Sequence, residues 1–367
     1  MSYLDWEYIK QRLSAQKISP TLLYSGLKKS GLIEKLPKNL QSDLRSTYLF
    51  NLAKNAIFLD EFIKIQSVFE TEKIPLMPLK GIAFLFCVYK DIGLRPMADI
   101  DFLILKKDVE KAKNLLLKLN YREEYCTFNY SKTERGRPVL LDMHHDIWYL
   151  KTLSRHKSDI YGLKQIWRDS RRFYLEDGNS ALIMSPQDLL INVAAHACLD
   201  HSQPTGVWLY DIVSICNVYK NNMHWQLLID KVISYNLQIP FHQTLKSAKE
   251  NFGAGIPQFV LEELRLKNNR YFEFRFYKAM QESLPIPKIG HLLRILTSAR
   301  LSGKLRLILF YFFPDKEFML SRYKIRDKRL VCFYYPLRII SLFSMTVGIM
   351  CLFFSREYKR SGYKSSI

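Results

Sequence analysis

Three aspartates and a histidine stand in two short apolar segments of the chain. Asp99 and Asp101 begin "DIDFLIL", and Asp142 and His144 lie within "VLLDMHHDIW". Both segments have the apolar pattern of strands, and side chains two residues apart on a strand emerge on the same face. We therefore expect each pair to project from one face of a sheet.

Carboxylates this close together repel one another unless a cation lies between them. A divalent ion supplies that charge, and ligation by oxygen alone suits magnesium or manganese. Asp142, on an adjacent strand, would add a third carboxylate and complete a site for two metal ions. The alternative is a solvated strand end at which Asp99 and Asp101 bind nothing, because the Asp-x-Asp spacing is common in proteins.

Two basic residues and a glycine precede these aspartates. Gly81 would let the backbone approach a phosphate at the start of a helix predicted from "IAFLFCVY", where Lys80 adds a positive charge. Arg95 is placed to contact a phosphate or to form a structural ion pair, and the sequence favours neither. For His144 the alternatives are orienting Asp142, accepting a proton from a substrate hydroxyl, or a purely structural hydrogen bond.

A further cluster, comprising His196, Cys198 and His201, raises the question of zinc. On a helix His196 and His201 are five residues apart and point away from each other, whereas a spacing of four places two ligands on one face. Asp200 has that spacing from His196. The pattern disfavours zinc, and no role for these residues follows from the sequence.

The elements that must position these side chains fall into four predicted regions. They are a helical N-terminal region, an α/β core of alternating strands and helices, a mainly helical region, and a basic, apolar C-terminal tail, at residues 1–72, 73–150, 151–300 and 301–367. The first region has an apolar stripe at helical spacing, formed by Leu49, Leu52, Ala53, Ile57 and Phe58.

Composition limits the partners and the compartment. The formal net charge of +20 favours an anionic partner such as a nucleotide, a nucleic acid or a membrane surface. Nucleic acid is the weakest of these, because most of the aromatic residues stand at helical spacing beside aliphatic ones, as in a core. The six scattered cysteines have no Cys-x-x-Cys pair, and the N-terminus lacks an export signal, so we expect a cytoplasmic protein.

The C-terminal tail has thirteen Lys and Arg residues against four Asp and Glu residues. Residues 339–354 are uncharged, but this run is shorter than the ~20 residues that a membrane-spanning helix needs. A buried core helix is one interpretation. The basic flanks with nearby tyrosines favour another, peripheral association with the inner face of a membrane through residues after about Lys328.

Taken in order, these motifs resemble the uncharacterised nucleotidyltransferase family of the DNA polymerase β-like nucleotidyltransferase superfamily. The resemblance covers about Leu49 to Pro257, and beyond the residues above it includes Asn120-Tyr121 and the segments "SPQDLL", "AAHACLDH" and "LYDI". It implies an α+β fold, with a mixed sheet flanked by helices and a further helical domain.

The resemblance also implies roles for individual residues. Asp99, Asp101 and Asp142 would be catalytic and would bind Mg²⁺ or Mn²⁺, while Lys80 and Gly81 would bind the nucleotide together with Arg95.

The activity implied is transfer of a nucleoside monophosphate from an NTP to an unknown acceptor hydroxyl. A small sugar, a lipid-linked sugar and a protein side chain are the acceptors considered, and such families are associated with polysaccharide biosynthesis. The alternative is a non-catalytic nucleotide-binding or regulatory protein on the same fold, although retention of three like charges counts against it.

Overall fold

The computed structural model describes residues 18–124, 129–147, 149–150, 162–174, 180–200 and 206–265 of the 367-residue chain. Near the C-terminus it also describes residues 301–314, 316–323, 325, 327–344 and 347. The fold is α+β, as the sequence predicts.

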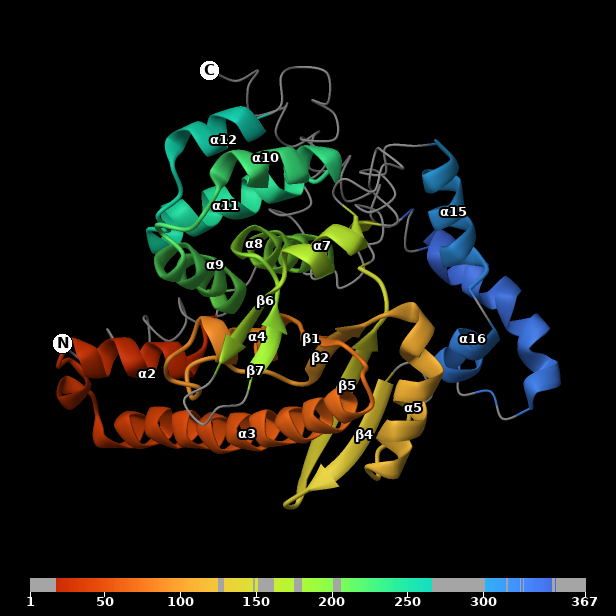
Figure 1. Ribbon diagram of the computed structural model, residues 1–367, viewed down its shortest axis with the longest axis horizontal. Coiled ribbons are helices and arrows are strands. Elements are labelled where there is room, and N and C mark those ends of the chain that lie inside the picture. Colours follow the sequence, from red (N-terminus) through yellow and green to blue (C-terminus); the bar gives the residue numbers. More distant parts are fainter. Residues whose placement is uncertain are drawn as a thin grey trace, which may run out of the picture.

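A five-stranded mixed sheet lies at the centre of the described structure (Figure 1). Its strand order is β1-β2-β5-β4-β3, in which β2 and β5 are parallel and the other neighbouring pairs are antiparallel. In chain order the strands are β1 (Leu76–Pro78), β2 (Ile100–Ile104), β3 (Arg122–Glu123), β4 (Asn129–Glu134) and β5 (Arg137–His144). The predicted alternation of strand and helix is confirmed, but β3 and β4 are additional strands that the apolar pattern did not indicate.

Helices of the N-terminal half pack beside this sheet (Figure 1). The long helix α3 runs along it and contacts α4, α5 and β1. These helices bury a continuous core with the sheet, and they span Pro20–Lys29, Lys38–Thr71, Lys80–Cys87 and Val109–Lys118 for α2, α3, α4 and α5.

The apolar stripe predicted for α3 is partly wrong. Ile57 and Phe58 are buried, but Leu49 and Ala53 are exposed. The buried face instead includes Asn51 and Asn55, whose side chains hydrogen-bond to backbone carbonyls of a neighbouring loop. A hydrophobic pattern misplaces this face because polar residues occupy part of it.

The region after residue 150 begins with a second, two-stranded sheet rather than with helices alone. Strands β6 (Arg171–Tyr174) and β7 (Ser180–Ile183) are antiparallel, and β7 contacts β1 of the central sheet. A helical layer follows, on the opposite side of the sheet from α3 in Figure 1. The short helix α7 (Leu163–Asp169) precedes β6. The layer itself consists of α8 (Pro186–Ala195), α9 (Gly206–Val218), α10 (Trp225–Ser234), α11 (Gln238–Phe252) and α12 (Gln258–Leu264).

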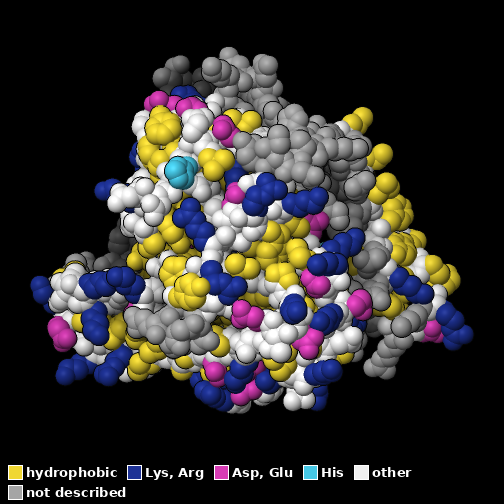
Figure 2. All heavy atoms as spheres, viewed as in Figure 1, with side chains coloured by type: hydrophobic (Ala, Val, Ile, Leu, Met, Phe, Trp, Pro, Cys, Tyr) yellow, Lys and Arg dark blue, Asp and Glu magenta, His cyan; other side chains and the backbone are white. Residues whose placement is uncertain are grey.

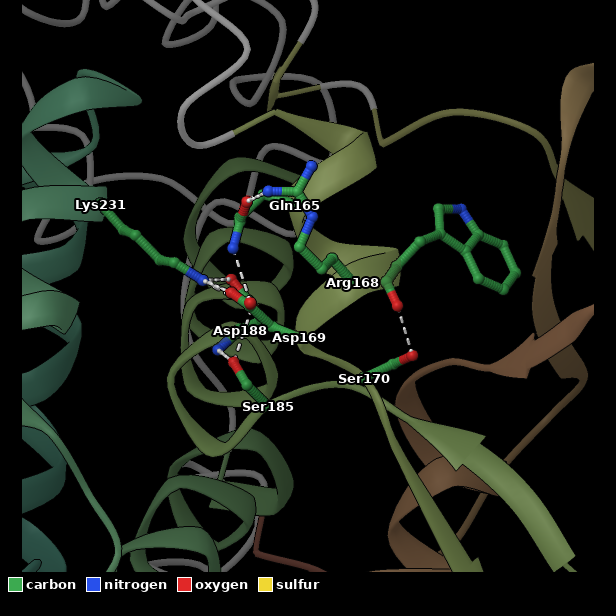
Figure 3. A network of polar contacts seen from close by, with 8 residues as sticks. Gln165, Arg168, Asp169, Ser170, Ser185, Asp188 and Lys231 are labelled. Atoms are coloured by element: carbon green, nitrogen blue, oxygen red, sulfur yellow. Dashed lines mark hydrogen bonds and ion pairs between the residues drawn. The ribbon is translucent and has the colours of Figure 1, made fainter.

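One helix start in this layer carries a buried ion pair (Figure 3). Ser185 is the N-cap of α8, with Pro186 at the first helical position as predicted, and its Oγ accepts a hydrogen bond from the Asp188 N–H. The Asp188 carboxylate in turn lies 2.7 Å from Nζ of Lys231 on α10, and both side chains are 1% exposed. Asp169 lies 3.3 Å from the same ammonium, so one cation joins α7, α8 and α10.

Three helical segments form the described C-terminal part. Helices α15 (Leu301–Phe312) and α16 (Lys316–Tyr323) precede a helix over residues 331–344. Within the described residues, no helix is long and apolar enough to cross a membrane. The remainder of the predicted uncharged run, residues 345–346 and 348–354, lies outside the described residues.

Removing the Lys231 ammonium tests the structural role of this ion pair. We expect Lys231→Met to lower the free energy of unfolding by about 3–5 kcal/mol, because it leaves the Asp188 carboxylate buried without a counter-charge. Urea denaturation measures the loss. The matched double variant Lys231→Met/Asp188→Asn removes both charges and should recover part of it, whereas a cost below about 1 kcal/mol for the single variant would contradict the assignment.

Candidate functional site

Asp101 and Asp142 lie side by side on neighbouring parallel strands. They are direct partners in the register of β2 and β5, so the predicted third carboxylate does stand next to the pair in "DIDFLIL". Their exposure differs: the side chain of Asp101 is 4% exposed and that of Asp142 is 34% exposed. Asp142 is therefore the member of the pair that a substrate can reach.

Asp99 lies in the bend directly before β2, which begins at Ile100. Burial and the nearby Asp101 charge raise the pKa of Asp99, so its carboxyl lies near that of Asp101. That the two side chains share one face stays a prediction. Among the described residues, the group with metal-ligand spacing consists of Asp101, Asp142 and His144, whose ligand atoms lie within 4.8 Å of one another.

Two cationic side chains supply the counter-charge at Asp101. Lys80 Nζ lies 2.6 Å from Asp101 Oδ1, and His144 Nε2 lies 3.1 Å from the same oxygen and 3.1 Å from Asp142 Oδ2. Burial alone would raise the pKa of Asp101, but Lys80 and His144 outweigh it and hold the pKa at about 2. Lys80 and His144 therefore compensate part of the negative charge of the two carboxylates.

The same contacts keep both bases charged. Burial lowers the pKa of His144, but hydrogen bonds to Asp101 and Asp142 outweigh burial and raise the pKa to about 9. Burial also lowers the pKa of Lys80, and the Asp101 charge more than offsets it, so the net shift is upward. Asp101, Asp142, Lys80 and His144 therefore form a compact, charge-compensated cluster, which we call the aspartate cluster.

The turn before α4 brings Lys80 to this cluster. Lys80 adopts a left-handed backbone conformation with φ of 47°, and the preceding Leu79 N–H donates to the Asp101 carbonyl at 2.9 Å. Non-glycine residues adopt this conformation rarely, and the described residues include four others outside the site, namely Lys73, Asn120, Arg135 and Asn236. Backbone and side-chain contacts to one residue, Asp101, thus fix both sides of the turn.

Gly81 leaves room for a neighbouring loop. A Cβ atom at Gly81 would lie 2.7 Å from Arg95 Nη1 and 2.6 Å from Met97 Sδ, and real Cβ atoms do not approach other atoms that closely. The space that the sequence argument reserved for a phosphate beside Gly81 is therefore taken by Arg95 and Met97. The assignment of Gly81 to nucleotide binding stays a prediction.

Arg95 forms the structural ion pair that was one of its two predicted roles. Its Nη2 lies 3.0 Å from Asp211 Oδ2 on α9, and Tyr89 donates its hydroxyl hydrogen to Asp211 Oδ1 at 2.7 Å. Both charged side chains are buried. The pair joins the loop before β2 to the helical layer, and direct contact between Arg95 and a nucleotide stays a prediction.

Helix α3 holds the same loop through polar side chains that sequence reasoning missed. Asn51 donates to the carbonyl of Gly93 at 2.8 Å, and Asn55 donates to the carbonyl of Arg95 at 2.7 Å. Tyr48 donates to the Asp91 carboxylate at 3.0 Å. The spacing of three and four residues between these side chains was a usable signal, since it places them on one helix face.

Lys54 is a further basic residue near the aspartates that the sequence analysis did not select. Its ammonium lies 5.4 Å from the centre of the Phe58 ring, and burial lowers its pKa although the Asp99 charge opposes that shift. Helix α3 therefore contributes a positive charge, that of Lys54, near Asp99.

His196 is another neighbour of the aspartate cluster. It begins a π-helical turn, His196–Asp200, directly after α8, and its ring packs edge-on against Trp208 at 5.6 Å between centroids. Burial, with the Lys80 charge adding to it, lowers the pKa of His196 to about 3. π-Helical turns inside α-helices are frequent at functional sites.

The disfavoured zinc interpretation gains no support from the described residues. Cys198 is buried, its Sγ lies 3.5 Å from the Ala195 carbonyl, and neither it nor His196 belongs to a group with metal-ligand spacing in the part of the chain that the structure describes. His201 lies outside the described residues.

Comparison with known proteins gives one strong match. Residues 2–253 match the model of a family described as uncharacterised nucleotidyltransferase. The match includes the aspartate cluster, α3 and most of the helical layer. No curated protein matches the sequence.

A search of solved structures finds an antigenic nucleotidyltransferase-like protein from Paracoccidioides brasiliensis. It is 14% identical, with a TM-score of 0.36, and the alignment covers 57% of this chain and 92% of the other.

The low pKa of His196 predicts a specific dependence of stability on pH. The unfolded chain binds a proton at His196 below about pH 6.5, whereas the folded chain does so only near pH 3, so the contribution of His196 to stability is full above pH 6.5 and falls as the pH drops. Relative to His196→Asn, the wild type should lose up to about 2 kcal/mol between pH 7 and pH 5. Urea denaturation of both proteins at each pH measures this difference. An unchanged difference would show that folded His196 titrates normally.

Proposed function

The chain belongs to the uncharacterised nucleotidyltransferase family, and on this premise we propose that it transfers a nucleoside monophosphate from an NTP to an acceptor hydroxyl, with release of pyrophosphate. The observation that supports the proposal most strongly is the pairing of Asp101 with Asp142 on adjacent parallel strands. Two carboxylates held side by side on adjacent inner strands of a sheet are an arrangement that suits this chemistry.

The aspartate cluster has the donor chemistry for a divalent cation. Carboxylate oxygens from Asp101 and Asp142 would hold Mg²⁺ or Mn²⁺. We propose Asp99 as the third ligand because, in addition to burial, the charges of Asp101 and Asp142 lie close enough to raise its pKa. His144 belongs to the same group of residues, but its Nε2 lies 3.1 Å from both carboxylates, so we do not propose it as a metal ligand. When bound, the ion supplies positive charge against the triphosphate and the developing charge on the attacking oxygen.

The reaction assigns different tasks to the two carboxylates. The acceptor oxygen forms a bond to the α-phosphorus, the bond from that phosphorus to the bridging oxygen breaks, and pyrophosphate leaves. The hydroxyl proton must pass to a base, and Asp142 is the carboxylate that solvent and substrate can reach. Asp101 is nearly inaccessible, so its task is to anchor the site.

The basic residues would act on the nucleotide in two ways. We propose that Lys80 contacts the phosphates, because its charged ammonium lies at the beginning of α4 beside Asp101. Arg95 is paired with Asp211, so we propose that it acts by holding the turn that contains Lys80 and Gly81. His144 would orient the two carboxylates through its hydrogen bonds to both.

The acceptor is unknown, and we propose three chemical classes for it: a small sugar, a lipid-linked sugar or a protein side chain. The helical layer from α8 to α12 lies next to the site through the contact of α4 with α8 and the Arg95–Asp211 pair. We therefore propose that this layer shapes the acceptor pocket. A role in polysaccharide biosynthesis rests on association with the family alone.

Labelled NTPs test the proposed transfer. The purified chain is incubated with each NTP labelled at the α-phosphate, with Mg²⁺ or Mn²⁺ and with extract that supplies acceptors. We expect label on an acceptor with the wild type and at least a ~100-fold lower rate with Asp142→Asn or Asp99→Asn, because each substitution removes a ligand charge from the site.

Asp146→Asn is the matched control, since it changes an aspartate four residues from Asp142 that is outside the metal-ligand group. It should retain the wild-type rate. Nucleotide binding without transfer to any species, at wild-type level in the aspartate variants, would favour the non-catalytic alternative and overturn the proposal.

A further inference from the structure

The C-terminal helices expose an unusual amount of apolar surface. Of the 21 large hydrophobic side chains that are exposed in the described residues, 12 lie in residues 301–347. Figure 2 shows hydrophobic atoms along the right-hand edge of the molecule, where α15 lies in Figure 1. Exposed apolar side chains that gather in one part of a protein are typical of an interaction site.

These side chains follow helical spacing on two helices. In the helix over residues 331–344 Phe333, Leu337 and Ile340 are 69%, 55% and 65% exposed, and their spacing of four and three residues places them on one face. In α15 Leu301 and Leu305 have the same spacing. We call these five residues the C-terminal apolar surface.

Other residues of the same helices hold them together. Arg338 Nε donates to the Tyr311 carbonyl at 2.7 Å, and the Tyr335 hydroxyl donates to the Pro314 carbonyl at 2.7 Å. The rings of Phe313 and Tyr335 stack at 6.2 Å between centroids. The C-terminal apolar surface stays exposed although the two helices pack against each other. This contradicts the buried-core interpretation for the described part of residues 339–354.

Charge decides between the two simplest occupants of this surface. Residues 301–367 carry a net charge of +9, from thirteen basic and four acidic residues. Arg329, four positions before Phe333, is 91% exposed and pairs with Asp327 at 3.2 Å. A second copy would bring the same positive charge against itself across a symmetric interface. Anionic lipid headgroups instead match both the exposed apolar side chains and the net positive charge of this part of the chain.

We propose that the C-terminal apolar surface binds an anionic lipid bilayer, with its apolar side chains at the boundary of headgroups and acyl chains. This extends the membrane-associated segment predicted from the sequence, which began after Lys328, to include α15. The helices lie on the bilayer and do not cross it. The inference does not depend on the transferase activity, although it would bring the catalytic site to a lipid-linked acceptor.

Vesicle flotation of the full chain tests the proposal. We expect the protein to float with vesicles of phosphatidylcholine and phosphatidylglycerol at low salt, to float poorly with phosphatidylcholine alone, and to lose binding as salt screens the headgroups. The triple variant Leu305→Glu/Leu337→Glu/Ile340→Glu should bind the anionic vesicles at least about tenfold more weakly than the wild type, because it places charges where apolar groups enter the bilayer.

A matched triple variant controls for added negative charge. Leu117→Glu/Val218→Glu/Phe259→Glu changes three hydrophobic side chains that are also exposed but lie on α5, α9 and α12. It should lower vesicle binding much less than the first variant, and circular dichroism should show both variants folded.

Three results would overturn the proposal. One is the absence of wild-type flotation with anionic vesicles at low salt, and another is equal loss of binding in the two triple variants. The third is a dimer that light scattering detects in the wild type and not in the Leu305/Leu337/Ile340 variant, without vesicle binding. That result would assign the surface to a second copy of the chain.

Discussion

The buried carboxylate of Asp101 is the constraint on which the rest of the site depends. An ionised carboxylate that is 3% exposed is costly to bury unless cations and hydrogen bonds surround it. Lys80 and His144 meet that requirement at 2.6 Å and 3.1 Å, and each reaches Asp101 from a different element of the core. Asp142 shares His144 with Asp101, so the two carboxylates tolerate each other without a bound ion.

Successive layers of contacts hold these partners in place. Lys80 stands in a turn next to the loop that contains Arg95. The two segments pack closely because Gly81 has no side chain, which leaves room for Arg95 and Met97. That loop is fixed from one side by Asn51 and Asn55 of α3 and from the other by Asp211 of α9. Helix α3 and the helical layer therefore both contact the loop that packs against the turn of Lys80. The family match, over residues 2–253, includes α3 and most of that layer.

Much of the fold and part of the site were predictable from local patterns. The apolar patterns located β2 and β5, and Ser185 with Pro186 marked the start of α8. That β2 and β5 are neighbours, with Asp101 opposite Asp142, was the hypothesis of a shared metal site and did not follow from alternation. Local patterns did not predict pairings between residues that are distant in sequence. Arg95 meets a carboxylate 116 residues away, and the partner of Lys80 was not evident because a cation can serve a phosphate or an aspartate equally well.

The remaining differences also have physical reasons. The buried face of α3 includes Asn51 and Asn55, which the apolar stripe did not include. A buried amide that donates to loop carbonyls has the polar character of a solvent-facing residue in a hydrophobicity pattern. Asp99 precedes the strand to which alternation assigned it, because a strand boundary is set by backbone pairing and not by side-chain type. The exposed face of the C-terminal helices is a third case, because apolar residues at helical spacing indicate a contact without saying what is contacted.

We propose that Asp101 and Asp142 together bind the divalent cation of a nucleotidyltransferase. Anomalous diffraction from crystals of the full chain grown with Mn²⁺ and a non-hydrolysable NTP tests it most directly. We expect a manganese peak within coordination distance of both carboxylates, and no peak there in Asp142→Asn crystals. Manganese bound elsewhere, with Lys80 and His144 still paired to Asp101 in the presence of the nucleotide, would contradict the claim.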